Sequence, residues 1–420
     1  MSRAHPLAAT PELPVVVVGA SLAGLAAAVR LARVGHHVVV LDRRTGPSTD
    51  PWLQPPVVEL PAAWRDVFRK SGRILDASLA ARGYDLVPAP PTPHEFSDGS
   101  TVALPTDRGQ QYVALVGLAG ERAAGAWRDL FDSADETWQL VRRAGLETEA
   151  DPGDPHTARL LADPRTVESE ASRLPDPRLA DLVREVAWRL GSAPELTPYW
   201  LLSRLVVQRT FGLWLVTRDG VPQPSETLTR LLGRRARDRG VEVRWGVAAT
   251  AVAPGRVTTA DGELEAAAVI SAVGWSAHTA LTGKAPALIA TPRLVGPFRV
   301  GTRRVPAQAP ASKTAGVFAA GGPVEVVRHS SAGVTTTWTL PGRTVVSTGA
   351  PRPSGLRWHG TGTVAAFHPL DDDGVWYAGS GTIGGTEPWA RLLTGALATY
   401  RVHEQVTGAD IRPSNKAYRP

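Results

Sequence analysis

Short apolar runs alternate with amphipathic stretches near the beginning of the chain. Residues 15–18 are four consecutive valines, a pattern that predicts a strand buried on both faces. Apolar residues at helical spacing follow over 25–34, and a second apolar run covers 38–41. This strand–helix–strand order predicts the start of a parallel sheet.

The same pattern returns in the second half of the chain. Apolar positions predict a helix that ends near Gly240, followed by short strands over 241–245, 249–253, 256–259 and 267–273. A final strand is predicted over 375–378, and a final helix over 388–406. We therefore expect one α/β unit assembled from separate parts of the chain.

The segments between these parts follow other periods. The stretch 45–61 contains five prolines and is predicted to be a loop, and 63–79 is predicted to be one helix. A hairpin is expected to turn at Asp98-Gly99. Further helices are predicted over 120–145 and 178–190, and 282–369 lacks a helical period and is expected to be mostly strand.

An apolar block over 199–215 has two interpretations, because Arg204 and Arg209 interrupt it. It is either a buried helix or a surface that docks on a bilayer. No apolar run reaches the ~20 residues of a membrane span, so we expect a cytoplasmic protein and leave a peripheral membrane contact open.

Composition narrows the function classes. The chain has 420 residues, of which 43% are hydrophobic and 20% charged, which is typical of a globular protein and excludes general disorder. It contains no cysteine, which excludes disulfides, thiolate catalysis and cysteine–zinc sites. The ten histidines include no ligand pair at helical spacing, so no metal is expected.

The net charge of +6 fits an anionic cofactor, an anionic membrane surface or nucleic acid. Several arginines gather over 234–239 at the predicted end of a helix, where cations complement the helix dipole. No aromatic residues are interleaved with them, so no nucleic-acid partner is expected. The oligomeric state is not predicted.

The first strand and helix are joined by a dinucleotide-binding fingerprint. Its turn consists of Gly19, Ala20, Ser21, Leu22, Ala23 and Gly24. Gly19 allows the tight turn, Gly24 allows close packing of helix on strand, and Asp42 at the end of the second strand is placed to bind a ribose. The departure is Ser21, where a second glycine is expected, although its hydroxyl could donate to a phosphate.

A second glycine-rich turn favours FAD over NAD. It follows the predicted strand over 375–378 and includes Gly379, Ser380 and Thr382. Two glycine turns that hold one ligand suit a long cofactor. Arg43 is a further candidate for contact with the cofactor. A cofactor with a 2′-phosphate is disfavoured, because the negative charge of Asp42 would repel that phosphate.

The chain resembles the phytoene-desaturase-type carotenoid desaturases within the amine-oxidase-like flavoproteins. The resemblance rests on the order of several segments: the fingerprint, 84–88 with 96–100, 210–214, 240–243 with 250–252, 261–273 and 379–388. It implies an α/β fold in which a Rossmann-like FAD-binding domain with a parallel central sheet carries an inserted α+β substrate domain. It also implies that Ala249 lies near the adenine.

The implied FAD-binding domain consists of residues 1–80, 220–282 and 366–420, and the substrate domain of 81–219 and 283–365. The implied function is an FAD-dependent oxidoreductase of carotenoid biosynthesis that removes hydride from, and so desaturates, a small apolar substrate of isoprenoid type. The sequence marks no catalytic residue.

Two departures from the family support an alternative. The glycine pair expected soon after Asp42 is absent, and 282–369 is short for the second part of the substrate domain. The alternative is a degenerate relative that has lost flavin turnover and acts as a partner or binding protein.

Overall fold

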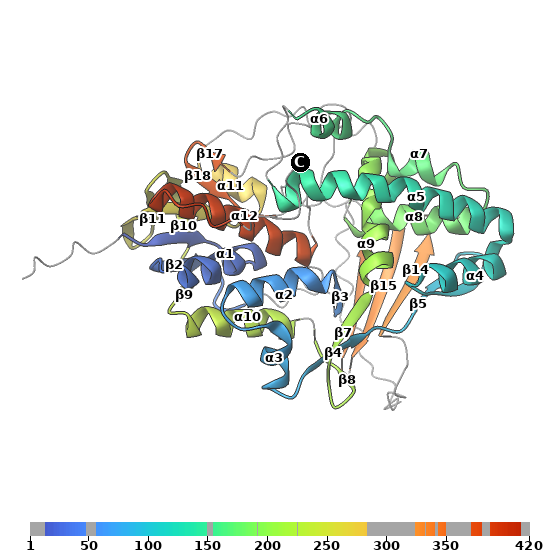
Figure 1. Cartoon of the computed structure of the whole chain (residues 1–420), viewed down its shortest axis with the longest axis horizontal. Helices are drawn as coiled ribbons and strands as arrows, with labels where there is room; N and C mark the ends of the chain where they lie inside the picture. Colours follow the sequence, from blue (N-terminus) through green and yellow to red (C-terminus); the bar gives the residue numbers. More distant parts are fainter. Residues whose placement is uncertain are drawn as a thin grey trace, which may run out of the picture.

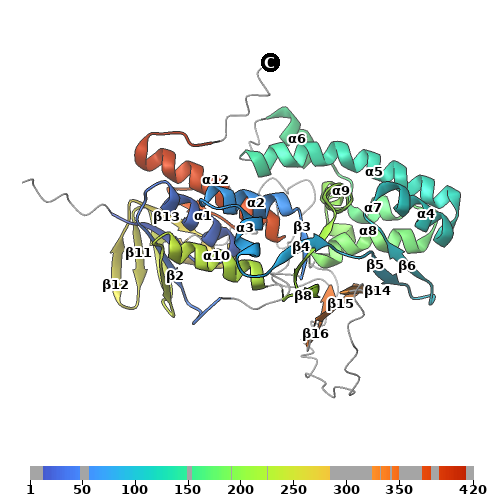
Figure 2. The same ribbon diagram turned by 60° about the horizontal axis from the view of Figure 1, so that its bottom comes forward.

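The computed structural model describes residues 13–47, 56–148, 154–190, 192–224, 226–283, 324–331, 333–340, 343–349, 371–379 and 387–412. Figure 1 shows two groups of elements side by side, and Figure 2 shows them after a rotation. The first and last parts of the chain lie together in one group.

The valine run becomes an inner strand of a six-stranded sheet, in the order β17-β18-β13-β1-β2-β9. All neighbouring pairs are parallel except β17 with β18. The strands are β1 (Val15–Val18), β2 (Val38–Asp42), β9 (Glu242–Trp245), β13 (Ala268–Ser271), β17 (Asp371–Asp372) and β18 (Val375–Tyr377). The chain continues from β1 to β2 on one side and places β13 on the other side, so the strand order reverses between β1 and β13. A crevice is expected at the carboxyl ends of these two strands.

Both faces of this sheet are covered, which explains why four consecutive valines are buried. Val15 and Val17 face a helical layer, and Val16 and Val18 face a three-stranded meander. The helical layer consists of α1 (Leu22–Arg33), α10 (Glu226–Asp238) and α12 (Pro388–Thr407), with α2 (Pro61–Lys70) and α3 (Leu75–Ala80) beside it. The meander consists of β10 (Ala249–Ala253), β11 (Arg256–Thr259) and β12 (Gly262–Glu265), next to α11 (Trp275–Leu281).

The second group of elements contains two further sheets. Their orders are β16-β15-β14-β5-β6, and β3-β7-β4 with β8 paired to β7. The strands are β3 (Val57–Glu59), β4 (Asp85–Pro88), β5 (Thr92–Glu95), β6 (Thr101–Leu104), β7 (Leu213–Arg218), β8 (Val221–Pro222), β14 (Glu325–Ser330), β15 (Gly333–Leu340) and β16 (Arg343–Gly349).

Helices cover these sheets (Figure 1). They are α4 (Arg108–Ala119), α5 (Glu121–Arg142), α6 (Pro155–Leu161), α7 (Val167–Ala171), α8 (Pro177–Arg189) and α9 (Ser203–Phe211), with the short helices η1 (Arg143–Glu147), η2 (Pro194–Leu196) and η3 (Tyr199–Leu202). Among the described residues, no helix is long and apolar enough to cross a bilayer.

The α/β fold class is confirmed, as are the βαβ start, the hairpin at Asp98-Gly99 and the final helix. Two predictions were wrong in detail. The predicted loop over 45–61 contains β3, which is held by its distant partner β7. The predicted single helix over 63–79 is broken at Gly72, whose φ of 103° is left-handed. The domain boundaries stay a prediction.

The apolar block over 199–215 is buried rather than offered to a bilayer. The whole of η3 is buried, as are Val206 and Val207 on α9. Arg204 is also buried, with its guanidinium paired to Glu387. These contacts favour the first interpretation, a buried helix, and Phe211, Leu213 and Trp214 at the end of the block are half-buried.

Candidate cofactor site and adjoining cavity

The turn between β1 and α1 needs both of its glycines. Gly19 has a φ of +107°, and a Cβ there would lie 2.8 Å from the carbonyl oxygen of Ala272 beyond β13. A Cβ on Gly24 would lie well inside van der Waals contact with the Gly19 carbonyl oxygen. The first turn of α1 therefore approaches the strand ends more closely than a side chain would permit.

Ser21 caps the helix that begins at this turn. Its backbone is extended, with φ −74° and ψ 173°, and its Oγ accepts a hydrogen bond from the Gly24 N–H at 3.2 Å. The N–H groups of Leu22 and Ala23 belong to the first helical turn and have no acceptor within the helix. Together with the positive end of the helix dipole, they form a site suited to a phosphate.

Asp42, at the end of β2, is tied to the same turn. Its Oδ2 accepts the Ala20 N–H at 2.7 Å and the Arg44 Nη2 at 2.7 Å, and its Oδ1 accepts the Arg44 Nε at 2.9 Å. Burial alone would raise the pKa of Asp42, but the hydrogen bonds from Arg44 and Ala20 outweigh it and hold that pKa below its usual range. The carboxylate is therefore ionised and stands beside the turn that starts α1.

The other predicted contacts lie around the same edge of the sheet. Arg43 follows Asp42 and is exposed, and Ala249 begins β10. Gly379 follows β18, where a Cβ would lie 2.7 Å from the Tyr377 hydroxyl. Ser380 and Thr382 lie outside the described residues. The carboxyl ends of β1, β2 and β18 thus bring together the Gly19 turn, Asp42 and Gly379.

These residues fit a dinucleotide cofactor. The close approach at Gly24 leaves backbone rather than side chain at the helix start, and Asp42 holds the turn in place. The local sequence was sufficient to predict the turn and the place of Asp42 beside it, because glycines and acid stand at fixed distances along a βαβ unit. Their role in cofactor binding stays a prediction.

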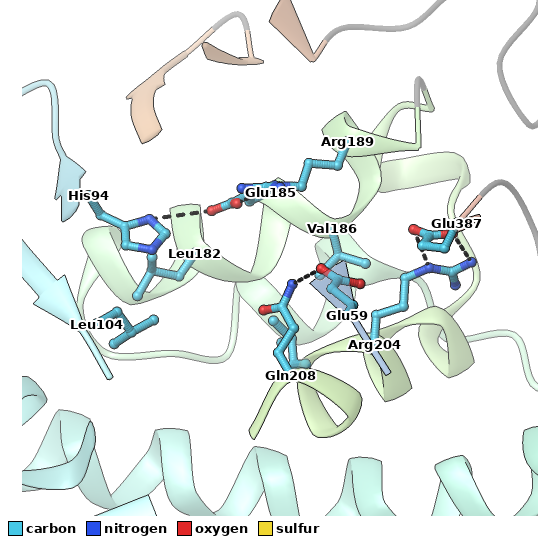
Figure 3. Close-up of a pocket in the computed structure, with 11 residues that line it drawn as sticks. Glu59, His94, Leu104, Leu182, Glu185, Val186, Arg189, Arg204, Gln208 and Glu387 are labelled. Carbon is cyan, nitrogen blue, oxygen red and sulfur yellow. Dashed lines mark hydrogen bonds and ion pairs between the residues drawn. The ribbon is translucent and has the colours of Figure 1, made fainter. Parts of the chain in front are cut away.

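A small cavity of about 60 Å³ lies among α8, α9, β3 and the start of α12 (Figure 3). Its walls combine apolar and ionisable side chains. They are Glu59, His94, Leu104, Leu182, Glu185, Val186, Arg189, Arg204, Leu205, Gln208 and Glu387. Glu387 is the N-cap of α12, directly after the predicted glycine-rich FAD segment.

Glu59 contributes one of the carboxyl groups of this cavity. Gln208 Nε2 donates to its Oε1 at 2.7 Å, and Trp389 Nε1 donates to its Oε2 at 3.3 Å. Burial raises the pKa of Glu59, and the negative charge of Glu387 raises it further. A carboxyl group whose pKa is raised takes up a proton more readily than an ordinary glutamate.

Glu387 itself contacts Arg204. The two side chains form an ion pair in which Nε–Oε1 and Nη2–Oε2 are each 2.7 Å long. Figure 3 shows this pair on one side of the cavity and the Gln208–Glu59 bond beside it. Sequence reasoning missed Glu59, because it stands in a stretch predicted to be a loop and its partners come from α9 and α12.

A second group of ionisable residues meets at the opposite side of the cavity. His94 Nδ1 lies 3.0 Å from His329 Nε2 and 3.4 Å from Glu185 Oε2. Burial lowers the pKa of His94 to about 4, so its imidazole is neutral at neutral pH. Sequence reasoning could not find this group, because no two of its members are neighbours along the chain.

Comparison with known proteins gives a family match over most of the chain. The family model described as FAD dependent oxidoreductase matches residues 14–375. Hydroxyneurosporene desaturase of Cereibacter sphaeroides is 32% identical over 254 residues, which is 55% of this chain and 49% of the relative. Phytoene dehydrogenase of Streptomyces griseus is 32% identical over 162 residues, 35% of this chain and 31% of the relative.

The first of these alignments spans about half the length of the curated relative and the second about a third. Among solved structures, cyclohexylamine oxidase from Brevibacterium oxydans is similar with a TM-score of 0.54 at 15% identity. That match covers 94% of this chain and 100% of the oxidase. At this identity it supports the fold alone.

Proposed function

The chain belongs to the family of FAD-dependent oxidoreductases, and from this premise we propose that it binds FAD and desaturates an apolar substrate of isoprenoid type. Family membership implies a flavin cofactor. The observation that supports a bound dinucleotide is the turn at the carboxyl end of β1, where Gly19 and Gly24 let the helix start close to the strand ends and Asp42 stands beside it. The choice of FAD rests on the family description. The desaturase activity rests on the names of the relatives.

The turn, the acid and the helix have separate tasks in this proposal. The N–H groups at the start of α1 hold the pyrophosphate, and Asp42 accepts the ribose hydroxyl groups. When bound, FAD supplies the acceptor for the hydride that leaves the substrate. The apolar cavity walls, including Leu104, Leu182 and Leu205, exclude water from the reacting bond.

Desaturation also releases a proton from the neighbouring carbon, and we assign its uptake to Glu59. The carbon–hydrogen electron pair becomes the new double bond, and the proton passes to a Glu59 oxygen. The raised pKa of Glu59 supports this role, as does its place beside the start of α12.

Cofactor binding is tested first, by colour. The purified chain should be yellow and bleach with dithionite, or take up added FAD. Asp42→Ala should weaken FAD retention by about 1–3 kcal/mol, the cost of losing charged hydrogen bonds. The matched control is Asp163→Ala, because Asp163 pairs with Arg165 two residues later just as Asp42 pairs with Arg44.

A colourless chain that FAD cannot reconstitute would contradict the proposal and favour the degenerate relative. Equal FAD retention in Asp42→Ala and Asp163→Ala would contradict the assignment of Asp42.

The reaction is tested with an acyclic isoprenoid polyene as substrate. Each new conjugated double bond shifts the absorption of the polyene to longer wavelength, so turnover is followed directly. Glu59→Gln should keep the flavin and lose most of the turnover, because an amide cannot take up the proton. Full turnover in Glu59→Gln would remove Glu59 from the mechanism.

A further inference from the structure

Three buried side chains from distant parts of the chain converge beside the cavity. His94 lies on β5 and His329 on β14, which pair as parallel neighbours with Val327 opposite His94. Because side chains alternate along a strand, both imidazoles stand on the same face of the sheet. Glu185 comes from α8, which packs against that sheet. All three residues are buried.

We propose that His94, Glu185 and His329 form a binding site for a divalent transition metal of the zinc class. The three ligand atoms are His94 Nδ1, His329 Nε2 and Glu185 Oε2. Their separations are 3.0 Å between the nitrogens, and 3.4 and 3.6 Å from the carboxylate oxygen to each nitrogen. Ligands held ~2.0–2.1 Å from a tetrahedral zinc ion stand about 3.3–3.4 Å apart, so the triangle already has the size of one face of that tetrahedron.

The chemistry of the ligand set selects the class of metal. Two imidazole nitrogens and one carboxylate oxygen suit zinc and its transition-metal neighbours, whereas magnesium and calcium prefer oxygen ligands. A hydrogen bond between the two imidazoles gives a partner to their nitrogens but none to the Glu185 carboxylate oxygen. A dication at the centre is attracted to all three atoms at once.

A salt bridge holds the carboxylate in the orientation that a metal ligand needs. Arg189 Nε pairs with Glu185 Oε1 at 2.5 Å, and Arg189 Nη2 pairs with Glu325 at 2.5 Å. This contact occupies Oε1 and leaves Oε2 directed at the two histidines. Partners of this kind orient metal ligands in known sites.

The arrangement has three protein ligands and one remaining position. His94 and Glu185 also line the cavity, so a water molecule or a small ligand can reach the metal from that side. The metal would join β5, α8 and β14, and its binding would stabilise this part of the fold. The inference does not depend on the proposed desaturase activity.

The test uses the full chain without a histidine tag. The protein is stripped with a chelator, dialysed against Zn²⁺, and its zinc content and thermal midpoint are measured. We expect about one zinc per wild-type chain and a higher midpoint with zinc than without. His94→Ala and His329→Ala should each weaken zinc binding at least about tenfold and abolish the thermal shift.

The matched control is His403→Ala. His403 is a buried histidine whose Nδ1 lies 2.9 Å from His36 Nε2, and among the described residues this second histidine pair belongs to no three-ligand group. This variant should keep its zinc. Glu185→Gln preserves the shape of the side chain and should also lower zinc affinity, which separates loss of a ligand from loss of folding.

Two results would overturn the site. Wild-type chain that carries almost no zinc after dialysis contradicts it directly. Zinc binding that is equal in the wild type and in a folded Glu185→Gln or His329→Ala variant would place the metal elsewhere.

Discussion

Ser21 stands where a dinucleotide turn has its second glycine, and its side chain has a task of its own. The hydroxyl oxygen accepts the Gly24 N–H and so caps α1, while the backbone of Ser21 needs no left-handed conformation. The hydroxyl proton remains available as a donor. A serine at this position can therefore serve both the helix and a phosphate.

We expect Ser21→Gly to leave FAD affinity equal or lower, because the change removes a donor and a helix cap. The cap itself contributes a few tenths of a kcal/mol relative to glycine and about 1 kcal/mol relative to alanine. Titration of apo-protein with FAD measures the affinity, and thermal melting measures the cap. Ser21→Ala is the companion variant, which should melt below Ser21→Gly; a clear gain in FAD affinity in Ser21→Gly would show that the side chain obstructs the cofactor.

The raised pKa of Glu59 makes a prediction about stability and pH. The folded chain binds the proton of the Glu59 carboxyl group more tightly than the unfolded chain does. The free energy of unfolding is therefore highest below the pKa of the unfolded chain, about 4.3, and declines as pH rises toward the pKa of the folded chain. Glu59→Gln removes this decline. The melting temperature of the variant should exceed that of the wild type at neutral pH and equal it near pH 4. A difference in melting temperature that stays constant between these pH values would contradict a raised pKa.

At the scale of elements, α1 and α12, which cover the six-stranded sheet, pack closely on each other. A Cβ on Gly395 of α12 would lie well inside contact distance of the Ala23 carbonyl oxygen and 3.0 Å from the Ala26 Cβ on α1. Small residues on both helices let their backbones meet. This contact fixes α1, and therefore the turn at its start that we propose to hold the pyrophosphate.

Gly395→Ala should destabilise the chain by about 1–3 kcal/mol, the usual cost of overpacking, and should lower FAD retention because α1 must move. Gly125→Ala is the matched control, since a Cβ on Gly125 of α5 meets nothing within 4 Å. The control should gain about 0.5–1 kcal/mol. Chemical denaturation measures both changes, and equal stabilities would show that the helices can separate at no cost.

At the scale of the whole molecule, the sequence predicts structures that neighbouring residues form. It does not predict contacts between segments that are far apart along the chain. The turn at Gly19 and the hairpin at Asp98-Gly99 depend on neighbours along the chain, so periodicity and turn chemistry were sufficient. Strand β3 depends on pairing with β7, more than 150 positions away, and the Glu59 environment depends on α9 and α12. The periodicity of apolar residues along the sequence does not indicate such long-range contacts.

Truncation tests how far the six-stranded sheet and its helical layer depend on the last helix, α12. A chain that ends at residue 386 lacks α12 and leaves the apolar face of α1 uncovered. It should aggregate or lose its cooperative melting transition. A chain that ends at Gly408 keeps α12 complete and should melt cooperatively; equal behaviour of the two would show that α12 is dispensable.

The packing of α12 on α1 also bears on how the protein is made. Thr399 on α12 lies against the Ala27 carbonyl oxygen, 372 positions earlier in the chain. At ribosomal rates of about 5–20 residues per second, roughly 20–70 s separate the emergence of α1 from that of the helix that covers it. During that interval the nascent chain presents an apolar helix to its surroundings. Chaperone protection is therefore expected during synthesis, until α12 covers α1.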